Sequence, residues 1–239
     1  MAELEPVSYR SGDTDLAGFI ADGSRGRKTA GILLAHEGGG LDDHIKSCAL
    51  ALAELGYVAF ACDLFGETDD PPYSRFRAIV QELRADRSLL RARMNAGLDV
   101  LLAHRSVDPQ RIAAVGFCFG GAAVIELART GAALKAVAGM HAGVLPAQNP
   151  DGNRAIGAAL LLCHGAADPV VPLDQILALT TELNATDVAW QLHVYGNVGH
   201  SFTNPAIDAF GIPGFAYDEQ ADRRSWQAML ELFEETLSP

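Results

Sequence analysis

Short apolar runs alternate with amphipathic stretches along most of this chain. The apolar positions in these runs are continuous rather than alternating, which is typical of strands buried on both faces of a parallel sheet. The predicted strands cover residues 29–36, 57–62, 111–117, 134–140, 158–163 and 188–194. Between them, apolar residues recur at helical spacing. The predicted helices cover residues 44–55, 75–104, 119–129, 173–184 and 218–237.

This order of elements predicts an α/β fold. Alternating strands and helices form an open, mostly parallel sheet with helices on both faces. Residues 7–20 predict an antiparallel hairpin around Gly12, and the Pro- and Asp- or Asn-rich stretches 66–73 and 146–154 predict surface loops. We find no repeat or linker, so we expect a single domain over residues 1–239.

Composition narrows the functional class. The 239 residues are 49% hydrophobic, enough for a sizeable core. The net charge of -12 argues against nucleic-acid binding, which needs a basic face. No apolar run is long enough to span a membrane, and residues 1–10 lack the pattern of a secretory signal, so we expect a cytoplasmic protein. The four cysteines are widely spaced and predict free thiols rather than a metal site.

The segment Gly116-Phe117-Cys118-Phe119-Gly120 has the spacing of a nucleophile elbow, with cysteine as the central residue. The glycines allow the strand and the helix to approach closely, and the turn directs the Cys118 side chain into a pocket. The helix N-terminus favours a thiolate, and the Phe119 N–H is a candidate oxyanion-hole donor. A buried cysteine in a glycine-rich junction is the alternative interpretation.

An acid and a base follow the nucleophile in the expected order. Asp168 lies just after the apolar run 158–163, in the sequence His-Gly-Ala-Ala-Asp, and His200 lies in a glycine-flanked loop after the last predicted strand. The chain order nucleophile, acid, histidine is that of α/β-hydrolases. We therefore predict a triad of Cys118, His200 and Asp168. A turn-forming role for Asp168 and a solvated loop histidine are the alternatives.

The loop after the first central strand reads His36-Glu37-Gly38-Gly39-Gly40 and resembles the HGGG loop of esterases. Such a loop supplies a second oxyanion-hole N–H, which we assign to Gly38. The Glu37 carboxylate would repel both a thiolate and an oxyanion. Either it points away from Cys118, or it holds Cys118 as a neutral thiol and later accepts its proton.

Four motifs in order resemble the dienelactone hydrolase family: Glu37, the elbow at 116–121, the segment 164–168 and the segment 199–202. The resemblance extends from about Thr29 to the C-terminal helix. It implies an α/β-hydrolase fold, a Cys118–His200–Asp168 triad without a cofactor, and a glutamate at position 37 that interacts with the resting cysteine. The implied reaction is hydrolysis of carboxylic esters or lactones through an acyl-enzyme.

One position departs from this family. Dienelactone hydrolases carry an arginine four residues after the catalytic histidine that helps to hold the substrate carboxylate, whereas this chain has Asn204. An amide is a poor replacement for an arginine–carboxylate pair. Arg77 or Arg84 is a candidate substitute, although both also fit a solvated helix face. Further candidate substrate contacts, each also explained by packing, are Phe65, His141, Phe202 and Asn204.

Other functional classes are less well supported by the sequence. An acyltransferase or thioesterase on the same fold, a non-catalytic binding protein and a thiol redox protein are the alternatives. The expected partner is a small-molecule ester or lactone, with the chain acting as a monomer or homodimer. The expected site contains no metal, because no metal-binding spacing is present.

Overall fold

The computed structural model describes residues 2–66, 73–148 and 152–238. Parts of the two predicted loops, residues 67–72 and 149–151, lie outside the described residues. Within the described part, eight strands form one sheet in the order β1-β2-β4-β3-β5-β6-β7-β8. The strands are β1 (Leu4–Ser11), β2 (Thr14–Asp22), β3 (Thr29–Ala35), β4 (Val58–Cys62), β5 (Val107–Phe117), β6 (Ala136–Met140), β7 (Ala159–Gly165) and β8 (Trp190–Tyr195).

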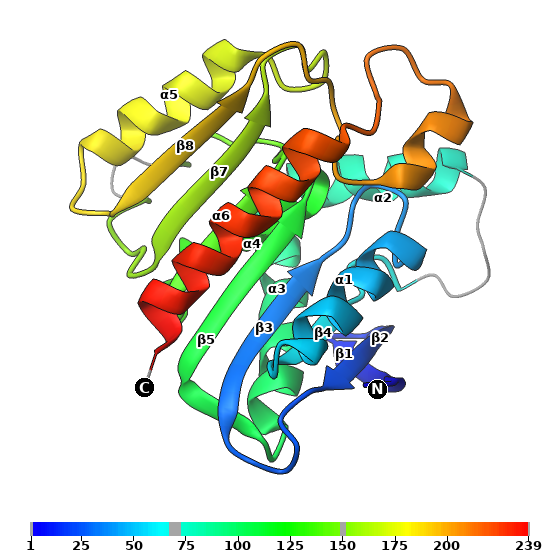
Figure 1. The fold of residues 1–239 in the computed structure, drawn as a ribbon, viewed down its shortest axis with the longest axis vertical. Coiled ribbons are helices and arrows are strands. Elements are labelled where there is room, and N and C mark those ends of the chain that lie inside the picture. Colours follow the sequence, from blue (N-terminus) through cyan, green and yellow to red (C-terminus); the bar gives the residue numbers. More distant parts are fainter. Residues whose placement is uncertain (1, 67–72, 149–151, 239) are drawn as a thin grey trace.

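The sheet is mostly parallel, as the sequence predicts. The hairpin β1–β2 is antiparallel and pairs antiparallel with β4, whereas the pairs from β4 through β3 and β5 to β8 are parallel. The carboxyl ends of the parallel strands consequently meet along one edge of the sheet (Figure 1). Candidate catalytic residues that follow different strands are brought together at this edge.

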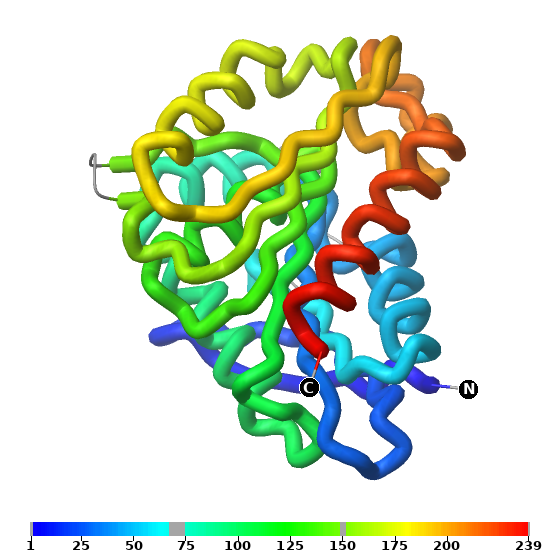
Figure 2. The backbone as a smooth tube through the Cα atoms, turned by 60° about the vertical axis from the view of Figure 1, so that its left-hand side comes forward, coloured from blue at the N-terminus to red at the C-terminus, as the bar shows by residue number. Residues whose placement is uncertain are grey.

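Helices cover both faces of the sheet. They are α1 (Asp43–Glu54), α2 (Tyr73–Ala85), α3 (Arg87–Ala103), α4 (Phe119–Ala128), α5 (Leu173–Asn184) and α6 (Glu219–Leu237), with a 3-10 helix η1 (Pro205–Phe210). α1 and α6 lie on one face, and α2 to α5 contribute to the core on the other (Figures 1 and 2). The predicted α/β-hydrolase fold class, with a mostly parallel sheet between helices, is confirmed.

The prediction of one long helix over 75–104 is wrong. The structure has two helices, and Asp86 lies between them as the N-cap of α3. Its side chain accepts a hydrogen bond from the Leu89 N–H at 3.0 Å. A carboxylate that satisfies an unpaired N–H competes effectively with helix continuation. The apolar spacing continues across the break, and periodicity alone therefore missed it.

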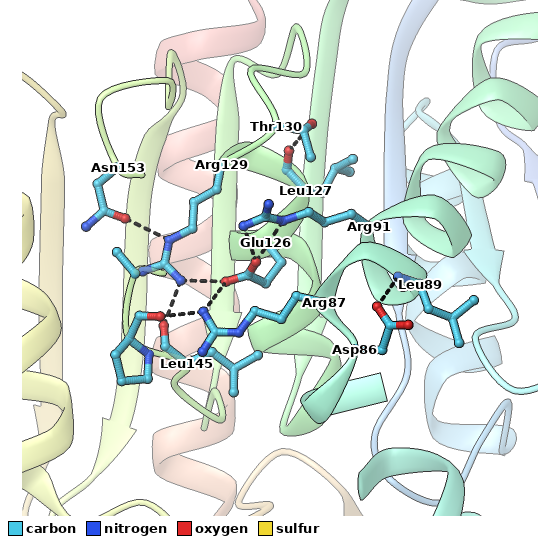
Figure 3. Close-up of polar contacts among 12 residues, drawn as sticks. Asp86, Arg87, Leu89, Arg91, Glu126, Leu127, Arg129, Thr130, Leu145 and Asn153 are labelled. Atoms are coloured by element: carbon cyan, nitrogen blue, oxygen red, sulfur yellow. Dashed lines mark hydrogen bonds and ion pairs between the residues drawn. The ribbon is translucent and has the colours of Figure 1, made fainter. Parts of the chain in front are cut away.

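A buried ion cluster anchors α4 to the neighbouring helix α3 (Figure 3). Glu126 of α4 has no exposed side-chain surface, and its carboxylate accepts from Arg129 Nη1 at 2.6 Å and from Arg91 Nε at 2.9 Å. Arg87 Nη1 lies 3.5 Å from the same carboxylate. Arg129 also donates to the carbonyl oxygen of Leu145 at 2.6 Å. The cluster thus joins the helix that follows Cys118 to the loop that follows β6.

Candidate active site

Cys118 occupies the sharp turn between β5 and α4. Its φ of 52° lies in the left-handed region, which is a strained conformation for cysteine. A Cβ on Gly116 would lie 2.0 Å from the carbonyl oxygen of Gly120, and a Cβ on Gly120 would lie 2.1 Å from that of Ala35. Both glycines are therefore required by close backbone contacts, which is the physical basis of the predicted elbow.

The three residues of the predicted triad form a continuous chain of contacts. Nε2 of His200 lies 2.9 Å from Sγ of Cys118, and Nδ1 of His200 lies 2.6 Å from Oδ2 of Asp168. The other oxygen of Asp168 accepts from the N–H groups of Val170 and Val171 at 2.7 and 2.9 Å. His200 is fully buried, whereas Cys118 is partly exposed. Of these two residues, Cys118 is thus the one that a small molecule from solvent can reach.

The charges in this group favour a protonated imidazole. Burial alone would lower the pKa of His200, but the neighbouring Cys118 and the hydrogen bond to Asp168 raise it above its ordinary value. Burial would raise the pKa of Asp168, whereas its hydrogen bond and charge interaction with His200 lower it. The contacts therefore favour an imidazolium at His200 that is hydrogen-bonded to the Asp168 carboxylate.

The two predicted oxyanion-hole donors lie at the ends of β3 and β5. Within the described part of the chain, neither the Phe119 N–H nor the Gly38 N–H donates a hydrogen bond to a protein acceptor. His36 contributes to the position of the Gly38 N–H, because its Nδ1 lies 2.6 Å from the carbonyl oxygen of the Glu37–Gly38 peptide. Since C=O and N–H of a trans peptide point in opposite directions, the Gly38 N–H points away from the His36 ring.

Glu37 lies among buried polar groups of the site, next to Ser201 and His141. Oε2 accepts from Ser201 Oγ at 3.3 Å, and Oε1 lies 3.6 Å from Nε2 of His141. In the described structure Glu37 makes no hydrogen bond with Cys118. Burial raises the pKa of Glu37 to about 7. This carboxyl can therefore change its charge close to neutral pH without contacting the sulfur.

The candidate substrate contacts are all buried. His141 and Phe202 have no exposed surface, Asn204 is 3% exposed and Phe65 is 4% exposed. Asn204 caps η1, where its side chain accepts from the Ala206 N–H at 3.0 Å. These side chains are packed in the interior around the site, and their direct contact with substrate stays a prediction.

Three functional positions were not identified from the sequence. His36 contacts the Glu37 carbonyl in the loop of the predicted oxyanion-hole donor Gly38, Ser201 donates to Glu37, and Thr203 contacts His141. Ser201 and Thr203 alternate with the predicted site residues His200 and Phe202 in the loop that follows β8, so their proximity in sequence is a signal that could have identified them. For His36, the signal was its place at the carboxyl end of a central strand.

The two candidate arginines differ in position. Arg77 and Arg84 are both exposed residues of α2. A Cβ on Gly143 would lie 3.2 Å from Nη1 of Arg84, and the Gly143 N–H donates to the carbonyl oxygen of Cys118 at 2.8 Å. Arg84 therefore lies next to the loop that contacts the nucleophile.

The described residues contain no group of three or more His, Cys, Asp or Glu side chains arranged to hold a metal ion. Among the same residues, no helix has both the length and the apolar character needed to cross a membrane.

Comparison with solved structures reveals close likeness over the whole chain. A dienelactone hydrolase-like promiscuous phosphotriesterase from metagenomic libraries is 39% identical, with a TM-score of 0.95, and 99% of each chain is covered. A structure named m3DLH is 41% identical, with a TM-score of 0.94 and the same coverage.

Sequence comparison gives more distant relatives and a family. A protein of Bradyrhizobium described as a probable 2-oxo-3-(5-oxofuran-2-ylidene)propanoate lactonase is 27% identical over an alignment of 182 residues that covers 72% of this chain and 72% of that protein. The model of the dienelactone hydrolase family matches residues 16–237. With this match over nearly its whole length, the chain belongs to the dienelactone hydrolase family.

Proposed function

We propose that this protein hydrolyses carboxylic esters or lactones with Cys118 as nucleophile, His200 as base and Asp168 as the residue that orients the base. The observation that carries this proposal is the pair of short contacts at His200, 2.9 Å to the Cys118 sulfur and 2.6 Å to Asp168. A nucleophile, a base and an orienting carboxylate in this order constitute the arrangement needed for acyl transfer.

In the proposed mechanism, the Cys118 thiolate attacks the substrate carbonyl carbon and the carbonyl electrons move onto oxygen. The N–H groups of Phe119 and Gly38 stabilise this oxyanion. The oxyanion collapses and the bond to the leaving oxygen breaks, while protonated His200 donates its Nε2 proton to that oxygen. A thioester remains on Cys118. Neutral His200 then takes a proton from water, which attacks the thioester and releases the acid. No cofactor takes part.

Lactones are the favoured substrate class, because a relative described as a lactonase covers 72% of this chain. Position 204 is an asparagine, which caps η1, so no arginine is present there to hold a substrate carboxylate. Arg84, next to the Gly143 loop, is the group proposed to receive a negatively charged substrate. Its exposure predicts a modest preference for anionic over neutral substrates, not an absolute requirement.

Phosphotriester cleavage is the second candidate activity. It is supported by the likeness to a promiscuous phosphotriesterase that is 39% identical over 99% of both chains. The same thiolate would attack phosphorus and displace an aryloxide, and the oxyanion-hole donors would face the phosphoryl oxygen.

The first prediction concerns Cys118. Wild-type protein should hydrolyse at least one member of a panel of aryl esters, small lactones and aryl phosphotriesters, and Cys118→Ala should lose at least about 10³-fold in kcat because no covalent intermediate can form. Steady-state rates and mass spectrometry of the trapped acyl-enzyme provide the measurement. An unchanged rate in Cys118→Ala would remove the cysteine mechanism. Product transfer to an added alcohol in preference to water would favour an acyltransferase.

The second prediction concerns the pH dependence of stability. The pKa of Glu37 rises from its ordinary value of 4.5 to about 7 on folding, so between these pH values the folded state binds a proton that the unfolded state has lost. Stability from this group is therefore complete below pH 4.5 and is lost as the pH rises toward 7. Glu37→Gln cannot ionise and should gain about 2–3 kcal/mol relative to wild type over this range.

Urea unfolding of both proteins at several pH values measures this difference. All other ionisable groups are shared by the two proteins, so their contributions largely cancel in the comparison. A constant difference between wild type and Glu37→Gln from pH 5 to pH 8 would show that Glu37 keeps its ordinary pKa in the folded protein.

A further inference from the structure

The last residue of β6 and the loop after it bind both polar backbone groups of Cys118. The Cys118 N–H donates to the carbonyl oxygen of Met140 at 3.0 Å and to Nδ1 of His141 at 3.1 Å. The Cys118 carbonyl oxygen accepts from the Gly143 N–H at 2.8 Å. His141 is the only one of these three residues that uses its side chain, and therefore the one whose contribution a substitution can remove.

Its hydrogen bonds assign the tautomer of His141. Because Nδ1 accepts from the Cys118 N–H, the neutral ring carries its proton on Nε2. Nε2 lies 2.8 Å from Oγ1 of Thr203 and 3.6 Å from Oε1 of Glu37. Burial lowers the pKa of His141 far below its ordinary value, as do the facing His200, His44 and His164 rings. The ring thus stays neutral and links the nucleophile to the loop that carries the catalytic base.

This link joins two strained residues. Cys118 has a φ of 52° and His141 a φ of 39°, both in the left-handed region. Such conformations persist where the surrounding contacts over-determine them. The backbone angles of Cys118 set the direction of its Cβ, and with it the 2.9 Å distance between Sγ and Nε2 of His200.

We propose that His141 is a positioning residue that holds the Cys118 peptide through Nδ1 and ties it, through Nε2 and Thr203, to the loop carrying His200. The inference rests on the proposed nucleophilic role of Cys118. Without the His141 side chain, the Cys118 N–H retains only the carbonyl oxygen of Met140 as an acceptor. The Cys118 sulfur then spends less time at the distance that proton transfer to His200 requires.

The test compares two substitutions of His141. In His141→Asn, Oδ1 takes the place of Nδ1 and still accepts from Cys118, and asparagine tolerates a positive φ. His141→Leu has no acceptor. The rate of Cys118 alkylation by iodoacetamide, located by peptide mass spectrometry, should fall at least about tenfold in His141→Leu and stay within about threefold of wild type in His141→Asn. For any ester hydrolysed, kcat should follow the same order with KM nearly unchanged.

Two further variants separate positioning from stability. Phe233→Leu leaves a cavity in the core between α6 and the sheet, next to Tyr57 at the amino end of β4, and should lower the unfolding midpoint without slowing alkylation. Thr203→Val removes the acceptor for Nε2 but leaves the Cys118 contact, and should slow alkylation by about two- to fivefold. If His141→Leu does not fold, the alkylation rate of Thr203→Val tests the positioning role.

The outcomes distinguish this inference from the proposed function. Alkylation at the wild-type rate in both His141→Leu and Thr203→Val would overturn the positioning role, even if esters are hydrolysed. Equal slowing in His141→Leu and His141→Asn would overturn the role of the Nδ1 contact. If the predicted alkylation order is found but no panel substrate is cleaved, the positioning role stands and the proposed hydrolysis fails.

Discussion

Replacing His200 with alanine is expected to lower kcat for ester hydrolysis by about 10⁴-fold or more. His200 is the only side chain of the described structure that contacts both the Cys118 sulfur and the Asp168 carboxylate. Without it, the thiol loses the partner that stabilises its anion, and neither the leaving oxygen nor the attacking water has a proton carrier. Steady-state hydrolysis of the best aryl ester from the panel measures the loss.

Two comparisons sharpen this result. Asp168→Asn leaves the imidazole in place but changes its preferred tautomer, so a loss of about 10⁴-fold is expected, at the lower end of the range for His200→Ala. His104→Ala is the control, because His104 precedes β5 and therefore lies at the end of the sheet opposite to Cys118. It should retain the wild-type rate. A folded His200→Ala protein with more than about a tenth of the wild-type kcat would contradict the assignment of His200 as the base.

The elbow was predictable because its requirements are local. Gly116 is needed by a contact within the turn, with Gly120, whereas Gly120 is needed by its approach to Ala35 at the end of the neighbouring strand β3; the turn itself fixes the spacing of the two glycines in the sequence. The apolar runs likewise predicted the parallel strands, because burial on both faces demands continuous hydrophobic residues. The order of Asp168 and His200 then followed from the order of the strands.

The buried contacts of His141 and Glu37 could not be predicted in the same way, because they join loops that are distant in sequence. A histidine directly after an apolar run, such as His141, suggests a pocket-lining residue, whereas its burial and its bond to Cys118 depend on two loops distant in sequence. Glu37 was expected either to point away from the sulfur or to restrain it. Its contacts with Ser201 and His141 agree with the first arrangement, and they arise from tertiary packing alone.

Two helix boundaries have local signals in the sequence that apolar spacing does not detect. Asp86 precedes the α3 sequence Arg-Ser-Leu and caps it, and Asn204 followed by Pro205 begins η1 with a cap and a proline in the first turn. Both are ordinary helix-start signals. The apolar spacing on either side of Asp86 remained in phase, which hid the boundary.

Replacing Glu126 with leucine is expected to destabilise the protein by about 3–5 kcal/mol. Glu126 is completely buried and is the carboxylate shared by Arg87, Arg91 and Arg129. Its removal leaves Arg129, whose side chain is 1% exposed, with Glu182 at 3.5 Å as its one charge partner among the described residues, beside neutral hydrogen bonds to Asn153 and Leu145. A desolvated cation with one distant partner is costly, because neither water nor a nearby anion compensates its charge.

Urea unfolding at neutral pH measures the free energy of unfolding that Glu126→Leu loses. Two further variants show how much of this loss comes from the buried charge. Glu126→Gln keeps one acceptor oxygen but replaces the other with an NH2 donor and lacks the charge, so its stability should fall between those of wild type and Glu126→Leu. Asp15→Asn breaks the Arg10–Asp15 pair, whose side chains are 62% and 86% exposed, and should leave stability unchanged within error. Equal stabilities of Glu126→Leu and wild type would show that the arginines find other partners or solvent when the carboxylate is removed.

The same substitution also tests how the cluster is connected to the site. α4 begins directly after Cys118, and Arg129 binds the carbonyl of Leu145 in the loop whose Gly143 contacts the nucleophile. Loosening the cluster should therefore increase the mobility of both elements that hold the elbow. We expect Glu126→Leu to inactivate on heating at a lower temperature than the one at which its helices unfold, because strained conformations are lost before global structure. Coincident loss of activity and helical circular dichroism would limit the cluster to a role in overall stability.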